Sequence, residues 1–190
     1  MFKKTITASL TFVLFSLMSC FAKENLKIKD FCKINIGTKR ADIEKFIGKP
    51  QEKLKSNFIY NLDYECKMKL IYKNDKLNKI LFIDPCKREY QLKSNQTSIS
   101  STAKTGILPS GPNQKNRTIS INDFCKVKEG MTYNKVVNLI GPNTGSIGFG
   151  MAWDVYEFPD SSYMKLWYNN NNLAFFNFVD CCNREYASVN

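Results

Sequence analysis

The sequence predicts an α+β fold of two tandem units, each with the element order α-α-β-β-β and with a helix pair packed on an antiparallel sheet. The first observation behind this prediction is an internal repeat in the 190-residue chain. Residues 28–50 align without gaps with residues 121–143 at 8 of 23 identical positions, and residues 68–90 align with residues 164–186 at 12 of 23. The second observation is that helical spacing of apolar residues precedes strand-like alternation in each copy.

The repeat also sets the expected domain boundaries. We expect a first repeat at residues 28–91 and a second repeat at residues 120–187, joined by a linker at residues 92–119 that is rich in small and polar residues. The offset between copies grows from 93 to 96, which indicates three inserted residues in the loop around Gly145 to Gly150. The linker is compatible with units that reorient and with units that pack sheet edge to sheet edge.

Two short helices are expected at the start of each repeat. In the second repeat Ser120 is a candidate N-cap with Asp123 three residues later, and Phe124 and Val127 supply one apolar turn before Gly130. The next helix is amphipathic and ends before a Gly-Pro or Gly-Lys-Pro sequence, because proline cannot continue the hydrogen-bond ladder. Its apolar stripe consists of Ile43, Phe46 and Ile47 in the first repeat and of Val136, Val137 and Ile140 in the second.

Three strands are expected to follow in each repeat. The first of them alternates, with Phe58, Tyr60, Leu62 and Tyr64 on one face in the first repeat. In the second repeat the same rule places Met151, Trp153 and Val155 on the face opposite Tyr156 and Phe158. The remaining two strands form a hairpin around a polar turn, at residues 68–72 and 77–83 and again at residues 164–168 and 173–179.

The first 22 residues are typical of a signal peptide, because Lys3 and Lys4 precede an apolar run too short to span a membrane. Leu17 to Cys20 also resembles a bacterial lipobox, in which the cysteine is acylated and becomes the new N-terminus. Cleavage after Ala22 is the alternative. Residues 1–22 therefore predict export. Residues 17–20 are the candidate lipobox, and Cys20 is the candidate lipidation site.

Six cysteines remain after this segment, and an even number in an exported protein indicates disulfide bonds. The repeat aligns Cys32 with Cys125 and Cys86 with Cys182, so the symmetric prediction is a bridge within each unit, Cys32–Cys86 and Cys125–Cys182. Cys66 and Cys181 have no counterpart in the other repeat. They either pair with each other across the two units or remain free.

The composition excludes most catalytic and metal chemistry. The chain contains no histidine, which removes His-based triads and metal centres, and it has no Cys-x-x-Cys motif. Asp84 and Asp180 begin matching D-x-C-x-R-E-Y motifs, and this duplication favours a structural role. We therefore predict no enzyme activity, no catalytic residues, no metal and no cofactor. The formal net charge of +11 is spread along the chain without a basic helix, so we predict no nucleic-acid partner either.

A glycine-rich stretch, Gly141 to Gly150, lacks the lysine and the preceding strand that a phosphate-binding loop needs. It leads into aromatic residues and is a candidate contact site for a partner protein. The candidate partner-binding residues are Gly148, Phe149, Met151 and Trp153. The alternative is that Trp153 and Trp167 belong to the sheet core.

The spacing Phe124-x5-Gly130-Met131-Thr132-x3-Val136-x4-Gly141-Pro142, followed by aromatic strands, resembles the SmpA/OmlA domain, the BamE-like fold of outer-membrane assembly lipoproteins. The same pattern in tandem, with a cysteine bridge in each unit, is similar to the β-lactamase inhibitory protein (BLIP-like) family. The first repeat departs from the motif, because Thr38 directly follows Gly37. No contact residue of either family can be carried over.

These observations predict a non-catalytic cell-envelope lipoprotein in the periplasm or at the outer membrane, tethered by a lipid on Cys20, that acts by binding envelope proteins. The alternative that the second resemblance implies is a secreted or periplasmic protein inhibitor whose target is a hydrolase.

Overall fold

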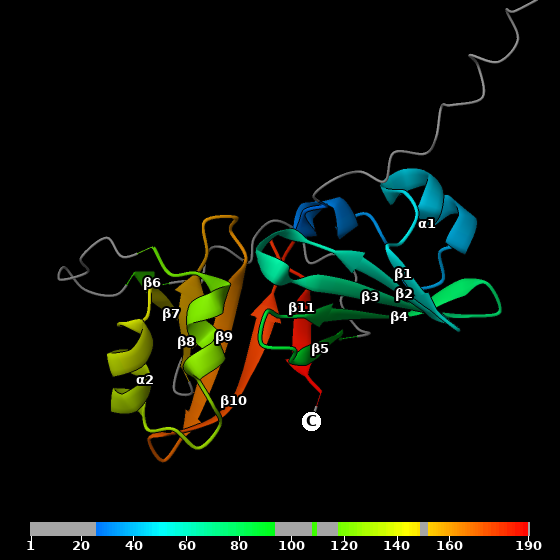
Figure 1. The fold of residues 1–190 in the computed structure, drawn as a ribbon. Coiled ribbons are helices and arrows are strands. Elements are labelled where there is room, and N and C mark those ends of the chain that lie inside the picture. Colours follow the sequence, from blue (N-terminus) through cyan, green and yellow to red (C-terminus); the bar gives the residue numbers. More distant parts are fainter. Residues whose placement is uncertain (1–25, 94–107, 110–117, 149–151, 190) are drawn as a thin grey trace, which may run out of the picture.

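The computed structural model describes residues 26–93, 108–109, 118–148 and 152–189 (Figure 1). Their strands form one antiparallel sheet in the order β1-β2-β3-β4-β5-β11-β10-β9-β8-β7-β6. Strands of the first repeat are β1 (Glu52–Leu54), β2 (Asn57–Asn61), β3 (Lys67–Lys73), β4 (Lys76–Ile83) and β5 (Glu89–Leu92). Those of the second repeat are β7 (Gly145–Ile147), β8 (Trp153–Glu157), β9 (Tyr163–Asn169), β10 (Asn172–Val179) and β11 (Glu185–Ser188), and β6 (Leu108–Pro109) pairs with β7 at the far edge.

The predicted fold class, two units that each place a helix pair on their own sheet, is wrong, because both repeats contribute to one continuous sheet. Strands β5 and β11 pair antiparallel at its centre, with Tyr186 opposite Leu92 and Ser188 opposite Tyr90. β5 covers part of the R-E-Y motif and extends into the residues predicted as linker. Pairing two strand edges satisfies backbone groups that an isolated unit would leave exposed. The two repeats are therefore one body in the structure.

The helices are also less extensive than the sequence suggested. The first helix of each repeat is a short 3-10 helix, η1 (Ile28–Phe31) or η4 (Ile121–Lys126), because each contains little more than one apolar turn before its glycine. The second is an α-helix of eight residues, α1 (Arg40–Ile47) or α2 (Tyr133–Ile140). The capping pattern predicted for η4 is present, since the backbone N–H of Ser120 donates to Asp123 Oδ2 at 2.9 Å.

The alternation predicted for the first strand breaks down at Tyr64. This residue lies in a 3-10 turn, η2 (Asp63–Glu65), has φ +58° and is 66 % exposed. Phe58, Tyr60 and Leu62 are buried on the predicted face. The strand ends at Asn61, so the side-chain alternation does not reach Tyr64.

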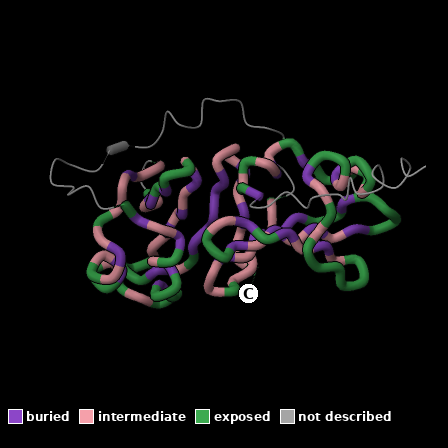
Figure 2. The backbone as a smooth tube through the Cα atoms, turned by 45° about the horizontal axis from the view of Figure 1, so that its top comes forward, coloured by how far each residue is buried: buried purple, intermediate pink, exposed green. Residues whose placement is uncertain are grey.

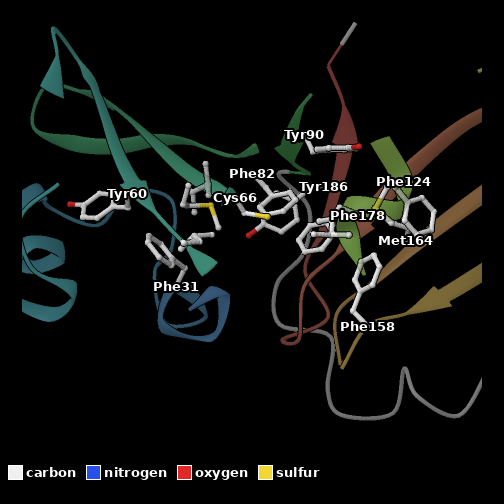
Figure 3. Packing of buried hydrophobic residues seen from close by; sticks show 14 of the residues in the cluster. Phe31, Tyr60, Cys66, Phe82, Tyr90, Phe124, Phe158, Met164, Phe178 and Tyr186 are labelled. Carbon is white, nitrogen blue, oxygen red and sulfur yellow. The ribbon is translucent and has the colours of Figure 1, made fainter. Parts of the chain in front are cut away.

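A single hydrophobic core extends through both repeats. Phe82 of β4 and Phe178 of β10 stack at the junction with ring centroids 4.1 Å apart, and Tyr186 lies 5.8 Å from Phe178 (Figure 3). Figure 2 shows buried positions running along the strands of both repeats, with exposed positions gathered at turns and on helices. Since each Phe is fully buried, the junction is as well packed as either half.

Candidate protein-binding site

Helix residues pack against one of the two faces of the sheet. Buried residues of the helices, such as Ile43 and Val136, join the core cluster with Leu70 of β3 and Leu166 of β9. Because side chains alternate along a strand, the intervening residues point to the opposite face, which we name the open face. One row of the open face crosses the sheet from β2 to β7 through Ile59, Lys69, Leu81, Gln91, Ala187, Asn177, Lys165, Val155 and Gly145.

Three aromatic side chains gather on the open face over β8, β9 and β10, and we name them the aromatic cluster: Trp153, Trp167 and Phe175. The ring centroid of Phe175 lies 5.2 Å from that of Trp153 and 5.0 Å from that of Trp167. Phe175 is 38 % exposed, and both tryptophans are half-buried. Neither tryptophan belongs to the core cluster. Clustered aromatic side chains with partial exposure have the composition of a protein-binding hot spot.

A lysine is held beside the aromatic cluster by a partly buried ion pair. Lys165 Nζ lies 4.6 Å from the Trp153 ring centroid and donates a 2.7 Å hydrogen bond to Glu185 Oε2. Glu185 also accepts from Asn177 Nδ2 at 2.6 Å and from Lys93 Nζ. Burial by itself raises the pKa of Glu185, but the hydrogen bonds from Lys165 and Lys93 outweigh it and lower the pKa below its usual value. Glu185 therefore stays ionised and fixes the lysine next to the tryptophan.

The first repeat keeps this ion pair but not the aromatic cluster. Lys69 Nζ donates to Glu89 Oε1 at 2.8 Å, at the positions that align with Lys165 and Glu185. The residues aligned with the aromatic cluster are instead Asn57, Ile71 and Lys79. The duplicated scaffold thus presents an aromatic surface in one half and a polar, basic surface in the other.

The structure places two of the four predicted partner-binding residues. Gly148 is exposed at the end of β7 with φ +108°, and Trp153 begins β8 and joins the aromatic cluster. Phe149 and Met151 lie outside the described residues. The β7–β8 connection, residues 148–152, replaces the two-residue connection Lys55–Ser56 between β1 and β2, which is where the sequence predicted the three-residue insertion.

Sequence reasoning missed Trp167 and Phe175 as candidate binding residues. The contacts of Phe175 with Trp153 and Trp167 depend on the register of β8, β9 and β10, which pairs Trp167 with Phe175. The available signal was alternation within β9, where Lys165 and Trp167 fall on the face opposite the buried Met164 and Leu166.

The two D-x-C-x-R-E-Y motifs form a pair of equivalent joints between the repeats. Asp180 Oδ2 accepts from Arg184 Nε at 2.7 Å and from the Tyr186 hydroxyl at 3.1 Å, and Asp84 makes the same bonds with Arg88 and Tyr90. Each arginine then reaches into the other repeat. Arg184 Nη1 donates to the Ile34 carbonyl and Arg88 Nη1 to the Val127 carbonyl, both at 3.1 Å. These carboxylates are occupied in structural hydrogen bonds.

The disulfide pairing predicted within each unit is wrong. The bridges are Cys32–Cys182 and Cys86–Cys125, with Cα atoms 5.8 and 5.3 Å apart, so each one joins the first helix of one repeat to the β-turn of the other. The repeat alone could not decide, because pairing within units and pairing between units are equally symmetric. Cys66 and Cys181 are free thiols. Burial raises the pKa of the Cys66 thiol to about 12, which makes it a poor nucleophile.

The predicted signal segment, including Cys20, lies outside the described residues. Among the residues that the structure does describe, no helix combines the length and the apolar character needed to cross a lipid bilayer. Comparison of the chain with protein-family models and with curated proteins finds no match.

Proposed function

We propose that this protein is a non-catalytic, exported binding protein that holds a partner protein against the open face of its sheet. The observation that carries the proposal is the aromatic cluster, which lies outside the core and leaves Phe175 38 % exposed. Solvent-exposed aromatic residues on a sheet face lower the solubility of a protein unless a partner covers them.

The scaffold is suited to such binding because it is rigid. Two disulfides and two arginine joints connect the repeats across the shared sheet. A surface that is fixed before binding loses less conformational freedom when the partner docks, which favours affinity.

The charge of the open face indicates the chemistry of the partner. In the first repeat the exposed Lys73 and Lys79 lie on or beside this face, whereas Lys67 pairs with Glu52 at 3.0 Å. We therefore propose a protein partner with an apolar patch for the aromatic cluster and an acidic patch opposite the first repeat. Such complementary charge mainly accelerates association and orients the partner.

Site-specific photo-cross-linking in cells that make the protein tests the proposal. A photoreactive phenylalanine analogue at position 175 should give a discrete protein adduct. The same analogue at position 46 is the matched control, because Phe46 is 53 % exposed but lies on α1. Adducts at both positions, or at neither, would contradict the proposal.

Charge reversal at the first repeat gives a second test. We expect Lys79→Glu to lower the yield of the position-175 adduct by about threefold or more and Lys45→Glu on α1 to leave it unchanged. An equal effect of both substitutions would argue against an acidic patch on the partner.

We also propose that Cys20 is acylated and tethers the protein to the outer membrane. Cys20→Ala should then move the protein from the membrane pellet to the soluble fraction, because a covalent lipid anchor would be lost. Quantitative blotting of the two fractions measures this. An unchanged distribution would show that cleavage after Ala22, or another contact, decides where the protein resides.

A second candidate function is inhibition of a hydrolase, and the doubly bridged scaffold beneath the open face favours it. Inhibitors of this kind bind tightly because little of the interface orders on binding. Purified protein should then slow substrate turnover by a β-lactamase or another periplasmic hydrolase, and Phe175→Ala should restore turnover. Unchanged turnover over a panel of such enzymes would remove this candidate.

A further inference from the structure

A third sulfur lies beside one of the two bridges. Cys181 Sγ is 3.8 Å from Cys182 Sγ, and the sulfur atoms of Cys32, Cys181 and Cys182 all lie within 4.8 Å of one another. Cys181 is a free thiol and is partly exposed. A thiolate attacks a disulfide sulfur that it can approach closely, so this arrangement places a nucleophile next to the Cys32–Cys182 bond.

The other joint lacks this third sulfur. Pro85 occupies the position aligned with Cys181, next to the bridged Cys86. The duplication therefore supplies an internal control, with the same turn and the same cross-link but no cysteine at the position aligned with Cys181.

Geometry selects which sulfur would accept the attack. Cys181 and Cys182 are neighbours in the chain, so their Cα atoms lie about 3.8 Å apart. Disulfides usually need at least about 4.4 Å between Cα atoms, which disfavours a Cys181–Cys182 bond. Attack on Cys32 Sγ has no such restriction, and it releases Cys182.

Arg184, two residues after Cys182, is the cation that we expect to stabilise the leaving thiolate. At the first joint Arg88 Nη2 lies 3.6 Å from Cys86 Sγ. At the second joint the aligned Arg184 is buried, and within the described residues its Nη2 atom has no hydrogen-bond partner. Stabilising the departing thiolate of Cys182 lowers the barrier to thiol–disulfide exchange.

We propose that Cys181 exchanges with the Cys32–Cys182 bridge, so that the protein exists as two disulfide isomers. The Cys181 thiolate forms a bond to Cys32 Sγ as the Cys32–Cys182 bond breaks, and Cys182 leaves as a thiolate that takes up a proton. One disulfide and one thiol are present before and after the step, so no oxidant is needed. The cross-link to η1 is kept while the free thiol moves by one residue along the β10–β11 turn.

Paired serine variants of the full chain test the exchange. After oxidative folding, trapping with N-ethylmaleimide and non-reducing peptide mass spectrometry, Cys182→Ser should contain a Cys32–Cys181 bridge. Cys86→Ser is the control and should leave Cys125 as a labelled thiol, because Pro85 offers no substitute. A free Cys32 in Cys182→Ser would overturn the proposal.

The parent protein provides a second measurement that does not depend on a variant folding. During incubation at pH 8, N-ethylmaleimide should label Cys182 as well as Cys181, and fragment spectra distinguish the two. Label on Cys181 alone throughout the time course would overturn the proposal. In Pro85→Cys, label should likewise divide between positions 85 and 86, because the substitution supplies the missing thiol.

The exchange should also accelerate with pH. Burial, followed by the negative charges of Asp180 and Asp160, raises the pKa of Cys181, and Arg184 opposes this shift. Below that pKa the thiolate fraction rises about tenfold per pH unit, so the rate of Cys182 labelling should rise by a similar factor. A rate that does not change between pH 7 and pH 9 would overturn the proposal.

Discussion

Asp154 is a carboxylate on the side of β8 that faces the core. It pairs with the buried Leu166 in the neighbouring strand, and its aligned residue in the first repeat is the buried Phe58. Asn143 Nδ2 donates a 2.9 Å hydrogen bond to Asp154 Oδ1. Burial raises the pKa of Asp154 to about 6, and the hydrogen bond from Asn143 only partly offsets it.

This raised pKa predicts how stability depends on pH. The folded state holds the Asp154 proton more tightly than the unfolded state, so stability falls as pH rises from about 4 to about 6 and stays reduced above that. A rise in the pKa of Asp154 from 3.8 to about 6 corresponds to about 3 kcal/mol of stability, which partial exposure reduces to about 1 kcal/mol. Asp154→Asn should therefore raise Tm by about 2–4 °C at pH 8 and by much less at pH 4.

Thermal unfolding followed by circular dichroism at the two pH values measures this effect. Asp42→Asn on the exposed surface of α1 is the control and should show no such gain. A loss of stability in Asp154→Asn at pH 8 would mean that the ionised carboxylate is preferred in the folded state.

At the scale of elements, the hairpins were predictable and the central strands were not. The β3–β4 hairpin follows from alternation and from a polar turn whose residues Asn74 and Asp75 both have positive φ, as a two-residue type I′ turn requires. β1 is exposed at every position, so it has no apolar pattern to detect. β5 and β11 are four residues long, and their role depends on pairing with each other across a separation of 94 to 98 residues, which local patterns cannot report.

The candidate site also contains one residue that the sequence predicted and one that it did not. Trp153 stands out in the sequence because it follows a glycine-rich loop. Phe175 was not predicted, because its place beside Trp153 and Trp167 exists only once three strands are in register.

The two joints differ in burial, which leads to a prediction about each. The side chain of Arg184 is 10 % exposed and that of Arg88 is 23 % exposed. Asp180→Asn leaves a buried guanidinium without its counter-charge and should lower the free energy of unfolding by about 3–5 kcal/mol. Asp84→Asn should cost less, because water reaches Arg88. Urea denaturation of both variants compares them, and an equal loss would show that burial of the arginine does not set the cost.

At the scale of the whole molecule, the shared sheet predicts a single unfolding transition. Both tryptophans of the chain belong to the second repeat, so their fluorescence reports that repeat alone. Far-ultraviolet circular dichroism reports strands of both repeats. Because Phe82 and Phe178 stack across the junction, the two signals should change at the same urea concentration.

Removing one disulfide tests how far this cooperativity depends on the cross-links between the repeats. Cys86→Ser with Cys125→Ser should lower the free energy of unfolding by about 2–4 kcal/mol. The two midpoints should still coincide, because the core at the junction remains. Midpoints that separate in the variant would show that the repeats cooperate mainly through the cross-link.

Both bridges run from one repeat to the other, and this fixes what happens to a nicked chain. A single peptide-bond cut between residues 94 and 107 leaves Cys32 and Cys86 on one fragment and Cys125 and Cys182 on the other. The fragments stay covalently attached at two points, so in denaturant they separate only when a reductant is also added. Bridges confined to each repeat would have left only the noncovalent contacts of the shared sheet and core between the two fragments, so the crossed pairing makes the connecting segment dispensable as a covalent link.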